Sequence, residues 1–202
     1  MPESNTPHLL ISLDHMTLAG FPSLLQYGIL LSVEKPVPVM RLLLDLPGIN
    51  EKYLQDEVQT IFVDGVAADD LQQDLSTGQT LALSAAMPGL AGAIFRREGM
   101  HGSLRSRPVK EKKHQVETDG YVTLKLFNSV ASDLVEPLLQ SGVCMHGEHF
   151  HAFASRRKDL IERSNMLVLD GDALSVDTLL EKVKTLPNLV IQIAFTDSAK
   201  DK

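Results

Sequence analysis

Residues 58–65 read VQTIFVDG, and this stretch decides how the first part of the chain is interpreted. Its β-branched and aromatic side chains favour a strand, and Asp64-Gly65 is a pair typical of the turn of a tight hairpin. Two further runs, GILLSV at residues 28–33 and LALS at residues 81–84, also predict strands. The three strands together predict a small sheet in this part of the chain.

Short helices are expected between these strands. Residues 39–46 read VMRLLLDL and predict a mostly buried helix. It ends before Pro47 because a residue that precedes proline avoids helical geometry. Asn50 can cap a second short helix, with Ile49 and Leu54 spaced as a hydrophobic staple. The first part of the chain therefore predicts an α+β lobe.

Residues from about 28 to 84 resemble a β-grasp, ubiquitin-like domain of the sulfur-carrier type, the fold of the thiamine sulfur carrier and of the small subunit of molybdopterin synthase. The resemblance rests on the helix at 39–46, on IFVDG at 61–65 and on LSTGQTLAL at 75–83. Carriers of this family act through a free C-terminal Gly-Gly. This chain continues beyond residue 84 and contains no Gly-Gly pair, so we do not expect the carrier chemistry.

The second part of the chain predicts an α/β lobe. Three runs predict strands: YVTLKLF at 121–127, MLVL at 166–169 and LVIQIAF at 189–195. The last run is almost wholly apolar, which favours a place at the centre of a sheet. Ser175 is placed to cap a helix whose apolar residues form one stripe.

The remaining elements are predicted from turn and capping residues. Ser132 is expected to cap a short helix, and Ser155 is expected to open a polar helix. Residues 143–153 predict a hairpin whose turn is His146-Gly147-Glu148. Residues 1–27 are mixed in character and predict no single element.

Two apolar residues followed by Asp or His and then Gly recur along the chain, at residues 62–65, 144–147 and 168–171. The recurrence has two interpretations. It can mean that the second lobe repeats a β-grasp-like plan. It can also reflect the turn chemistry that any hairpin uses. The sequence leaves both open.

Charge divides the chain into three segments, which together give the net charge of −7. Residues 1–95 carry −8, residues 96–114 carry +5 and the remainder carries −4. The basic segment contains glycine and proline and almost no core residues, as in a linker or exposed loop. We therefore expect an α+β fold with a β-grasp-like lobe at 1–95, a basic linker or exposed loop at 96–118 and an α/β lobe at 119–202.

Composition bears on the compartment and on the class of partner. The single cysteine, Cys144, cannot form an internal disulfide, which fits a reducing compartment. The N-terminus lacks a signal-peptide pattern, and charged residues and prolines interrupt every long apolar run. We therefore expect a cytoplasmic protein without a membrane contact. The acidic chain has no tryptophan, and its basic segment lacks interleaved aromatic residues, which argues against nucleic-acid binding.

Cys144, His146, His149 and His151 form the densest group of metal-ligating residue types in the chain. Thiolate and imidazole groups are ligands for zinc and other transition metals. On a hairpin, however, Cys144 and His146 share one face of the first strand, while His149 and His151 lie across the turn. No second pair of ligands accompanies them. We expect structural use and no bound metal, and no catalytic residue is assigned.

Residues 85–107 combine small apolar residues with arginines, which suits a contact surface or an anion site. The candidate contact residues are Met87, Leu90, Phe95, Arg96, Arg97, Arg105 and Arg107. We expect a non-enzymatic binding or assembly module, without a cofactor, that contacts a protein partner or a second copy of itself. The alternatives are a metalloprotein or enzyme that uses the hairpin at 144–151, and a binder of a phosphorylated ligand held by these arginines.

Overall fold

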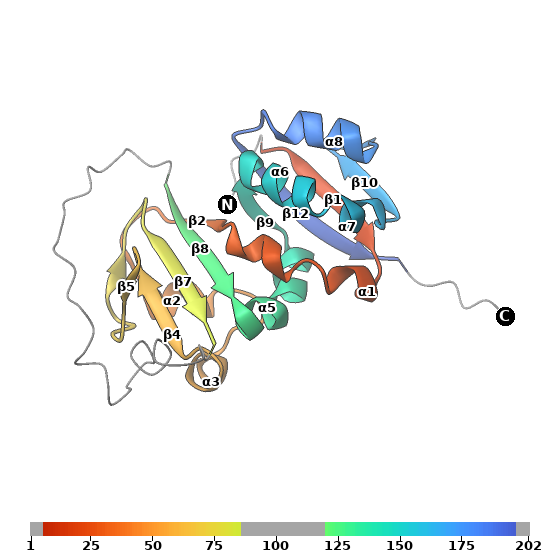
Figure 1. Ribbon diagram of the computed structural model, residues 1–202. Helices are drawn as coiled ribbons and strands as arrows, with labels where there is room; N and C mark the ends of the chain where they lie inside the picture. The colour runs from red at the N-terminus through yellow and green to blue at the C-terminus, as the bar shows by residue number, and fades with distance from the viewer. Residues whose placement is uncertain (1–5, 86–119, 197–202) are drawn as a thin grey trace. The chain divides into compact units, whose positions relative to one another are not determined.

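The computed structural model describes residues 6–85 and 120–196 (Figure 1). These residues form two compact units. Unit 1 combines the chain up to Leu30 with the chain from Leu134 onward, and unit 2 is Leu31–Asp133. Both units contain strands and helices, which confirms the mixed α/β class. The predicted domain boundaries at 95 and 119 lie outside the described residues and stay a prediction.

Unit 1 is built on a sheet with the strand order β11-β10-β1-β12-β9. These strands are β1 (His8–Leu13), β9 (Val143–His146), β10 (Met166–Leu169), β11 (Asp172–Ala173) and β12 (Asn188–Phe195). β12 lies between β1, to which it is parallel, and β9, to which it is antiparallel. The expected central place of the last strand is confirmed. β1 was not expected, because its partners lie more than 150 residues away in the sequence.

Three helices pack on one face of this sheet in Figure 1: α6 (Gly147–Arg156), α7 (Lys158–Glu162) and α8 (Val176–Val183). Alternate strand residues such as Leu9, Ile11 and Ile191 are fully buried, as expected for a sheet covered on one face. Ser175 caps α8, accepting a hydrogen bond from Thr178 N as predicted. Two shorter helices, α1 (His15–Leu18) and η1 (Pro22–Gln26), follow β1.

Unit 2 has a sheet in which β8 (Tyr121–Phe127) runs parallel to β7 (Thr80–Ser84), followed by β4 (Thr60–Val63) and β5 (Val66–Ala67). The strand predicted at residues 28–33 is β2 (Ile29–Ser32), which begins in unit 1 and continues into unit 2 beside β8. A second sheet pairs β3 (Val37–Pro38) with β6 (Asp74–Leu75).

The two helices and the hairpin predicted between residues 39 and 65 are present. The helices are α2 (Val39–Leu44) and α3 (Glu51–Asp56). Asn50 caps α3, its Oδ1 accepting from Tyr53 N at 2.8 Å. β4 and β5 form an antiparallel hairpin through Asp64 and Gly65, which have φ angles of 51° and 79°. Two successive residues with positive φ are the signature of the hairpin turn predicted from this pair.

The predicted hairpin at residues 143–153 is wrong. β9 ends at His146, and α6 begins at the next residue, Gly147. The strand pairs with β12 instead of with the residues that follow it, for example Cys144 with Val190. A Cβ atom on Gly147 would collide with the carbonyl oxygens of Val183 and Leu186. This glycine therefore serves the close packing of α6 against the end of α8 and does not serve a turn.

Two helix boundaries also differ from the prediction. The helix assigned to a cap at Ser132 is α5 (Asn128–Ser141), which starts four residues earlier, directly after β8. Ser155 lies in the last turn of α6 and does not open a helix. Arg157, with φ −120° and ψ 41°, departs from helical geometry and separates α6 from α7. The capping residue types were present, but packing decided where the helices begin.

The order of elements recurs along the chain. Residues 24–28 (LLQYG) precede β2 and residues 138–142 (LLQSG) precede β9, and each glycine has positive φ. Further on, Asp170 and Gly171 repeat the hairpin turn of Asp64 and Gly65, with φ angles of 51° and 93°. After each turn the same bond forms: Ala68 N donates to Ile61 O at 2.8 Å, and Leu174 N donates to Leu167 O at 2.9 Å. The two parts of the chain thus share the segment before β2 and β9, the Asp-Gly turn and the bond that follows it. Residues 144–147 form no hairpin turn.

Candidate functional site

The cysteine and histidines singled out in the sequence lie at the junction of β9 and α6 in unit 1. Met145 is fully buried, while Cys144 and His146 on either side of it are half-buried. The two therefore share the opposite face of β9, as predicted from strand alternation. His149 and His151 come from the first turns of α6, because the expected second strand is a helix.

His146 is held by the beginning of β12. Its Nδ1 atom lies 2.9 Å from Asn188 Oδ1 and 3.4 Å from Pro187 O. Both neighbours are hydrogen-bond acceptors, so this geometry fits a tautomer that donates through Nδ1 and leaves Nε2 as the acceptor. The imidazole is thereby fixed in orientation.

The rings of His149 and Tyr27 extend this arrangement into a row. The ring centroids of His146 and His149 lie 5.2 Å apart, nearly perpendicular to each other. Tyr27 lies next, 6.4 Å from His149, and Arg156 Nη1 donates to its hydroxyl group at 3.4 Å. We call His146, His149 and Tyr27 the ring row. The His146–His149 contact is edge-to-face and the Tyr27–His149 contact is tilted. Ring contacts of these kinds stabilise packing between elements, here between α6 and the chain that follows η1.

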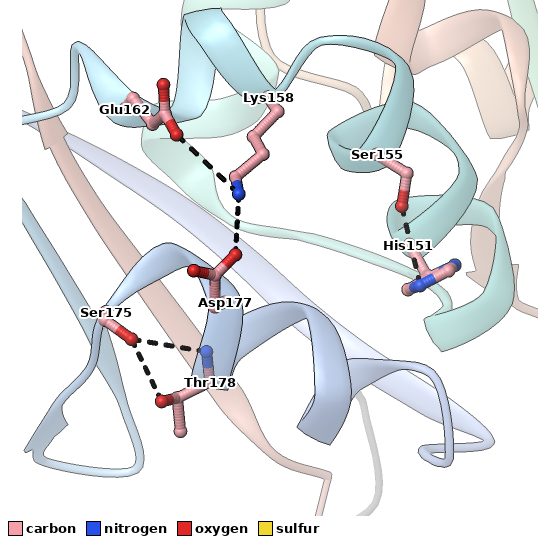
Figure 2. Close-up of polar contacts among 7 residues, drawn as sticks. All are labelled: His151, Ser155, Lys158, Glu162, Ser175, Asp177 and Thr178. Carbon is pink, nitrogen blue, oxygen red and sulfur yellow. Dashed lines mark hydrogen bonds and ion pairs between the residues drawn. The ribbon is translucent and has the colours of Figure 1, made fainter.

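His151 does not join the ring row. Figure 2 shows it directed toward Ser155 on the same helix, with 3.4 Å between His151 Nε2 and Ser155 Oγ. Within residues 6–85 and 120–196, no group of three His, Cys, Asp or Glu side chains is placed to hold a metal ion. The helix thus separates the residues that the predicted hairpin would have placed on two neighbouring strands.

Burial raises the pKa of the Cys144 thiol above its ordinary value. A raised pKa lowers the fraction of thiolate at neutral pH, and the thiolate is the form that attacks electrophiles and binds metals. Reactive cysteines have the opposite environment, with a cation or a helix N-terminus nearby to lower the pKa. Cys144 is therefore chemically a packed thiol.

A second polar cluster joins α7 to α8 (Figure 2). Lys158 Nζ lies 2.6 Å from Asp177 Oδ1 and 3.8 Å from Glu162 Oε1. The hydrogen bond to Asp177 raises the pKa of Lys158, which keeps the amine charged. All three side chains are exposed, so water screens the ion pairs and each contributes little to stability. The cluster therefore links α7 to α8 at the surface of unit 1.

The predicted contact residues, from Met87 to Arg107, lie outside the described residues. Within the described part of unit 2, acidic side chains outnumber basic ones by ten to four, a net charge of −6. All ten acidic residues are exposed: Glu34, Asp45, Glu51, Asp56, Glu57, Asp64, Asp69, Asp70, Asp74 and Asp133. They are spread over the loops, turns and helices of unit 2 and the short strand β6, and we call this set the acidic surface. Its charge is opposite to that of the basic segment at 96–114.

Two exposed methionines were not anticipated from the sequence. Met16 is 86% exposed and Met166 is 46% exposed. Met166 pairs with Ser12 near the end of β1, and α1, which holds Met16, begins shortly after that strand, so both lie at the same end of the unit 1 sheet. Methionine suits adaptable contact surfaces, but no periodic pattern in the sequence marks either residue as exposed.

Comparison of the chain with models of known protein families, with curated proteins and with solved structures finds no match. No helix among the described residues is both long enough and apolar enough to cross a membrane.

Proposed function

We propose that this protein is a non-enzymatic, cytoplasmic assembly module that associates with a second copy of itself through charge. In this proposal the basic segment at 96–114 of one copy contacts the acidic surface of another. The observation that carries it is the acidic surface: ten exposed carboxylates in unit 2, on a chain that concentrates seven of its nineteen basic residues within nineteen positions.

Electrostatic complementarity of this kind steers association and sets its specificity. It acts over a Debye length of about 8 Å at physiological ionic strength and about 3 Å at 1 M salt. Association through the acidic surface is therefore expected to weaken steeply as salt concentration rises. An apolar interface would respond in the opposite direction.

The proposed module includes a ubiquitin-like, β-grasp lobe at its N-terminal side. The order of strand, helices, strand, Asp-Gly hairpin and final strand from β2 to β7 supports this part of the proposal. The chain lacks the Gly-Gly of the carriers it resembles, so the lobe acts by contact and not by carrying sulfur.

The test compares molar mass by light scattering at 50 mM and at 500 mM NaCl. The wild type is expected to form a dimer or larger species at low salt and a monomer at high salt. The variant Arg96→Glu/Arg97→Glu is expected to be monomeric at both. Its matched control is Lys182→Glu/Lys184→Glu, which makes the same change of net charge on exposed residues of unit 1 and keeps the salt-sensitive association.

A wild type that is monomeric at 50 mM NaCl excludes self-association. An Arg96→Glu/Arg97→Glu variant with the mass of the wild type excludes the basic segment as the contact. Dissociation by inorganic phosphate, but not by NaCl of equal ionic strength, would instead favour a phosphate-binding role for the arginines.

A further inference from the structure

The sheet of unit 1 consists of four strands from the second half of the chain and one strand, β1, from the first half. β1 lies between β10 and β12, and Leu9 is paired with Leu169 on one side and with Ile191 on the other. Leu9, Ile11 and Leu13 are fully buried there. Without β1, the second half of the chain would leave a gap between two strands of its own sheet, and both neighbouring strands would lose a hydrogen-bonding partner.

Unit 2 depends in the same way on the second half. β8 is parallel to β7, with Leu81 paired with Leu124 and Leu83 paired with Leu126. Val122, Leu124 and Leu126 are fully buried. The first half of the chain therefore supplies β7, β4 and β5, but the strand that covers the other side of β7 comes from the second half.

Each unit has a similar pair of hydrogen bonds at its own Asp-Gly turn. Asp64 accepts from Thr80 N through Oδ1 at 2.9 Å and donates from its own N–H to Thr80 O at 2.8 Å. Asp170 makes the same two bonds with His8, at 2.7 Å and 2.9 Å. Thr80 belongs to the same half as Asp64, whereas His8 belongs to the other half from Asp170. The strand beside the Asp-Gly hairpin is therefore β7 in unit 2, which comes from the same half as the hairpin. In unit 1 it is β1, which comes from the other half.

We infer that the two halves of the chain complete each other's sheets: the first half supplies β1 to the sheet of the second half, and the second half supplies β8 to the sheet of the first. The interaction surfaces are the gap between β10 and β12 in the second half and the open side of β7 in the first. The partner that fits each surface is the other half of the chain. Residues 1–102 and 103–202 accordingly form a specific, non-covalent complex after the chain between them is cut. This inference does not rest on the proposed self-association.

The test starts from the folded full-length protein with a recognition sequence for a specific protease, flanked by Gly/Ser spacers, inserted between Gly102 and Ser103. After complete cleavage at 500 mM NaCl, the two fragments are expected to coelute at the mass of the intact chain and to survive a tenfold dilution. Urea is expected to separate them, and its removal is expected to restore the complex. Fragments that separate in native buffer after cleavage would overturn the inference.

A cysteine pair provides an independent readout of the exchange, in a Cys144→Ala background. Ser12→Cys/Met166→Cys places thiols on residues that are paired across the two halves. After oxidation and cleavage, a non-reducing denaturing gel is expected to show one band. The control Thr60→Cys/Ser84→Cys joins paired residues within the first half and is expected to give two bands. Two bands from the Ser12→Cys/Met166→Cys protein would contradict the exchange.

Discussion

Asp170 holds the first residue of β1, His8, from 162 positions away in the sequence. The His8 N–H donates to Asp170 Oδ1 at 2.7 Å, and the Asp170 N–H donates to His8 O at 2.9 Å. The side chain can make this bond because the Asp-Gly turn at the end of β10 directs it toward β1. One turn residue therefore fixes both the local hairpin and the position of a distant strand.

Removing this carboxylate is expected to destabilise the protein. Asp170→Ala leaves the His8 N–H without its acceptor, and the net contribution of a typical hydrogen bond to stability is about 0.5–1.5 kcal/mol. We expect a loss of about that size in the free energy of unfolding, measured by urea denaturation at pH 7. Asp64→Ala is expected to give a similar loss, because Asp64 makes the same bonds with Thr80. Asp170→Asn keeps an acceptor and should lose less. A loss below about 0.5 kcal/mol for Asp170→Ala, the size usual for a surface change, would contradict the anchor.

Gly147→Ala is expected to be more harmful than Gly20→Ala. The added methyl group meets the backbone carbonyls of Val183 and Leu186, which cannot move without displacing the end of α8. Overpacking of this kind costs about 1–3 kcal/mol. Gly20→Ala is the control, since its methyl group meets the flexible end of Leu160 and the guanidinium group of Arg157. Equal losses in melting temperature for the two variants would argue against close packing at Gly147.

The Cys144 thiol is expected to ionise at a higher pH in the folded protein than in the unfolded chain. Burial raises its pKa, so the rate of alkylation by iodoacetamide should begin to rise at a higher pH in native buffer than in 8 M urea. The comparison uses the midpoint of the pH–rate curve and not the rate itself, because restricted access also slows alkylation. A native midpoint at or below the denatured one would be inconsistent with a packed thiol.

Asp14 is expected to contribute a pH-dependent part of stability. Its Oδ1 accepts from Thr17 N at 2.7 Å, which holds the pKa of the carboxyl below 3.8 in the folded protein. The folded pKa is therefore below the unfolded one, so the contribution is present above the unfolded pKa and is lost as the pH falls through the folded pKa. Asp14→Asn keeps the cap but cannot titrate. The difference in unfolding free energy between wild type and Asp14→Asn should shift in favour of the variant on acidification, and a constant difference from pH 2.5 to 6 would contradict the assignment.

The double variant Cys144→Ala/His149→Ala separates the assembly proposal from a metal or catalytic role. We expect it to keep the salt-dependent molar mass of the wild type, because neither residue belongs to the proposed contact. Wild-type protein washed with a chelator is expected to contain no stoichiometric transition metal. Bound metal, or loss of association in the double variant, would favour a function at the junction of β9 and α6.

Local chemistry explains which parts of the fold were predictable. The Asp64-Gly65 hairpin and the caps at Asn50 and Ser175 depend on residues close in sequence, and each is present. Gly147 resembled a turn glycine because the carbonyls it packs against lie more than 30 residues away. β1 was missed for a related reason, since its six residues become a strand only beside β10 and β12.

The candidate site was predictable to a smaller extent. The shared face of Cys144 and His146 follows from strand alternation and is present, but the placement of His149 and His151 depended on a second strand that is a helix. Phe150, Phe153 and Ala154 show helical spacing and are buried. This spacing indicates a helix over these residues. The prediction followed the histidines and the glycine instead and assigned a hairpin.

The exchanged strands have a consequence for how the molecule is made. β1 leaves the ribosome long before its partner β12, which ends at Phe195. Chains are synthesised at about 5–20 residues per second, so β12 is completed roughly 10–40 s after β1. Throughout that time Leu9, Ile11 and Leu13 lack the sheet partners that bury them in the folded protein. Synthesis of this protein therefore creates a defined period in which a chaperone, or a neighbouring nascent copy, competes for β1.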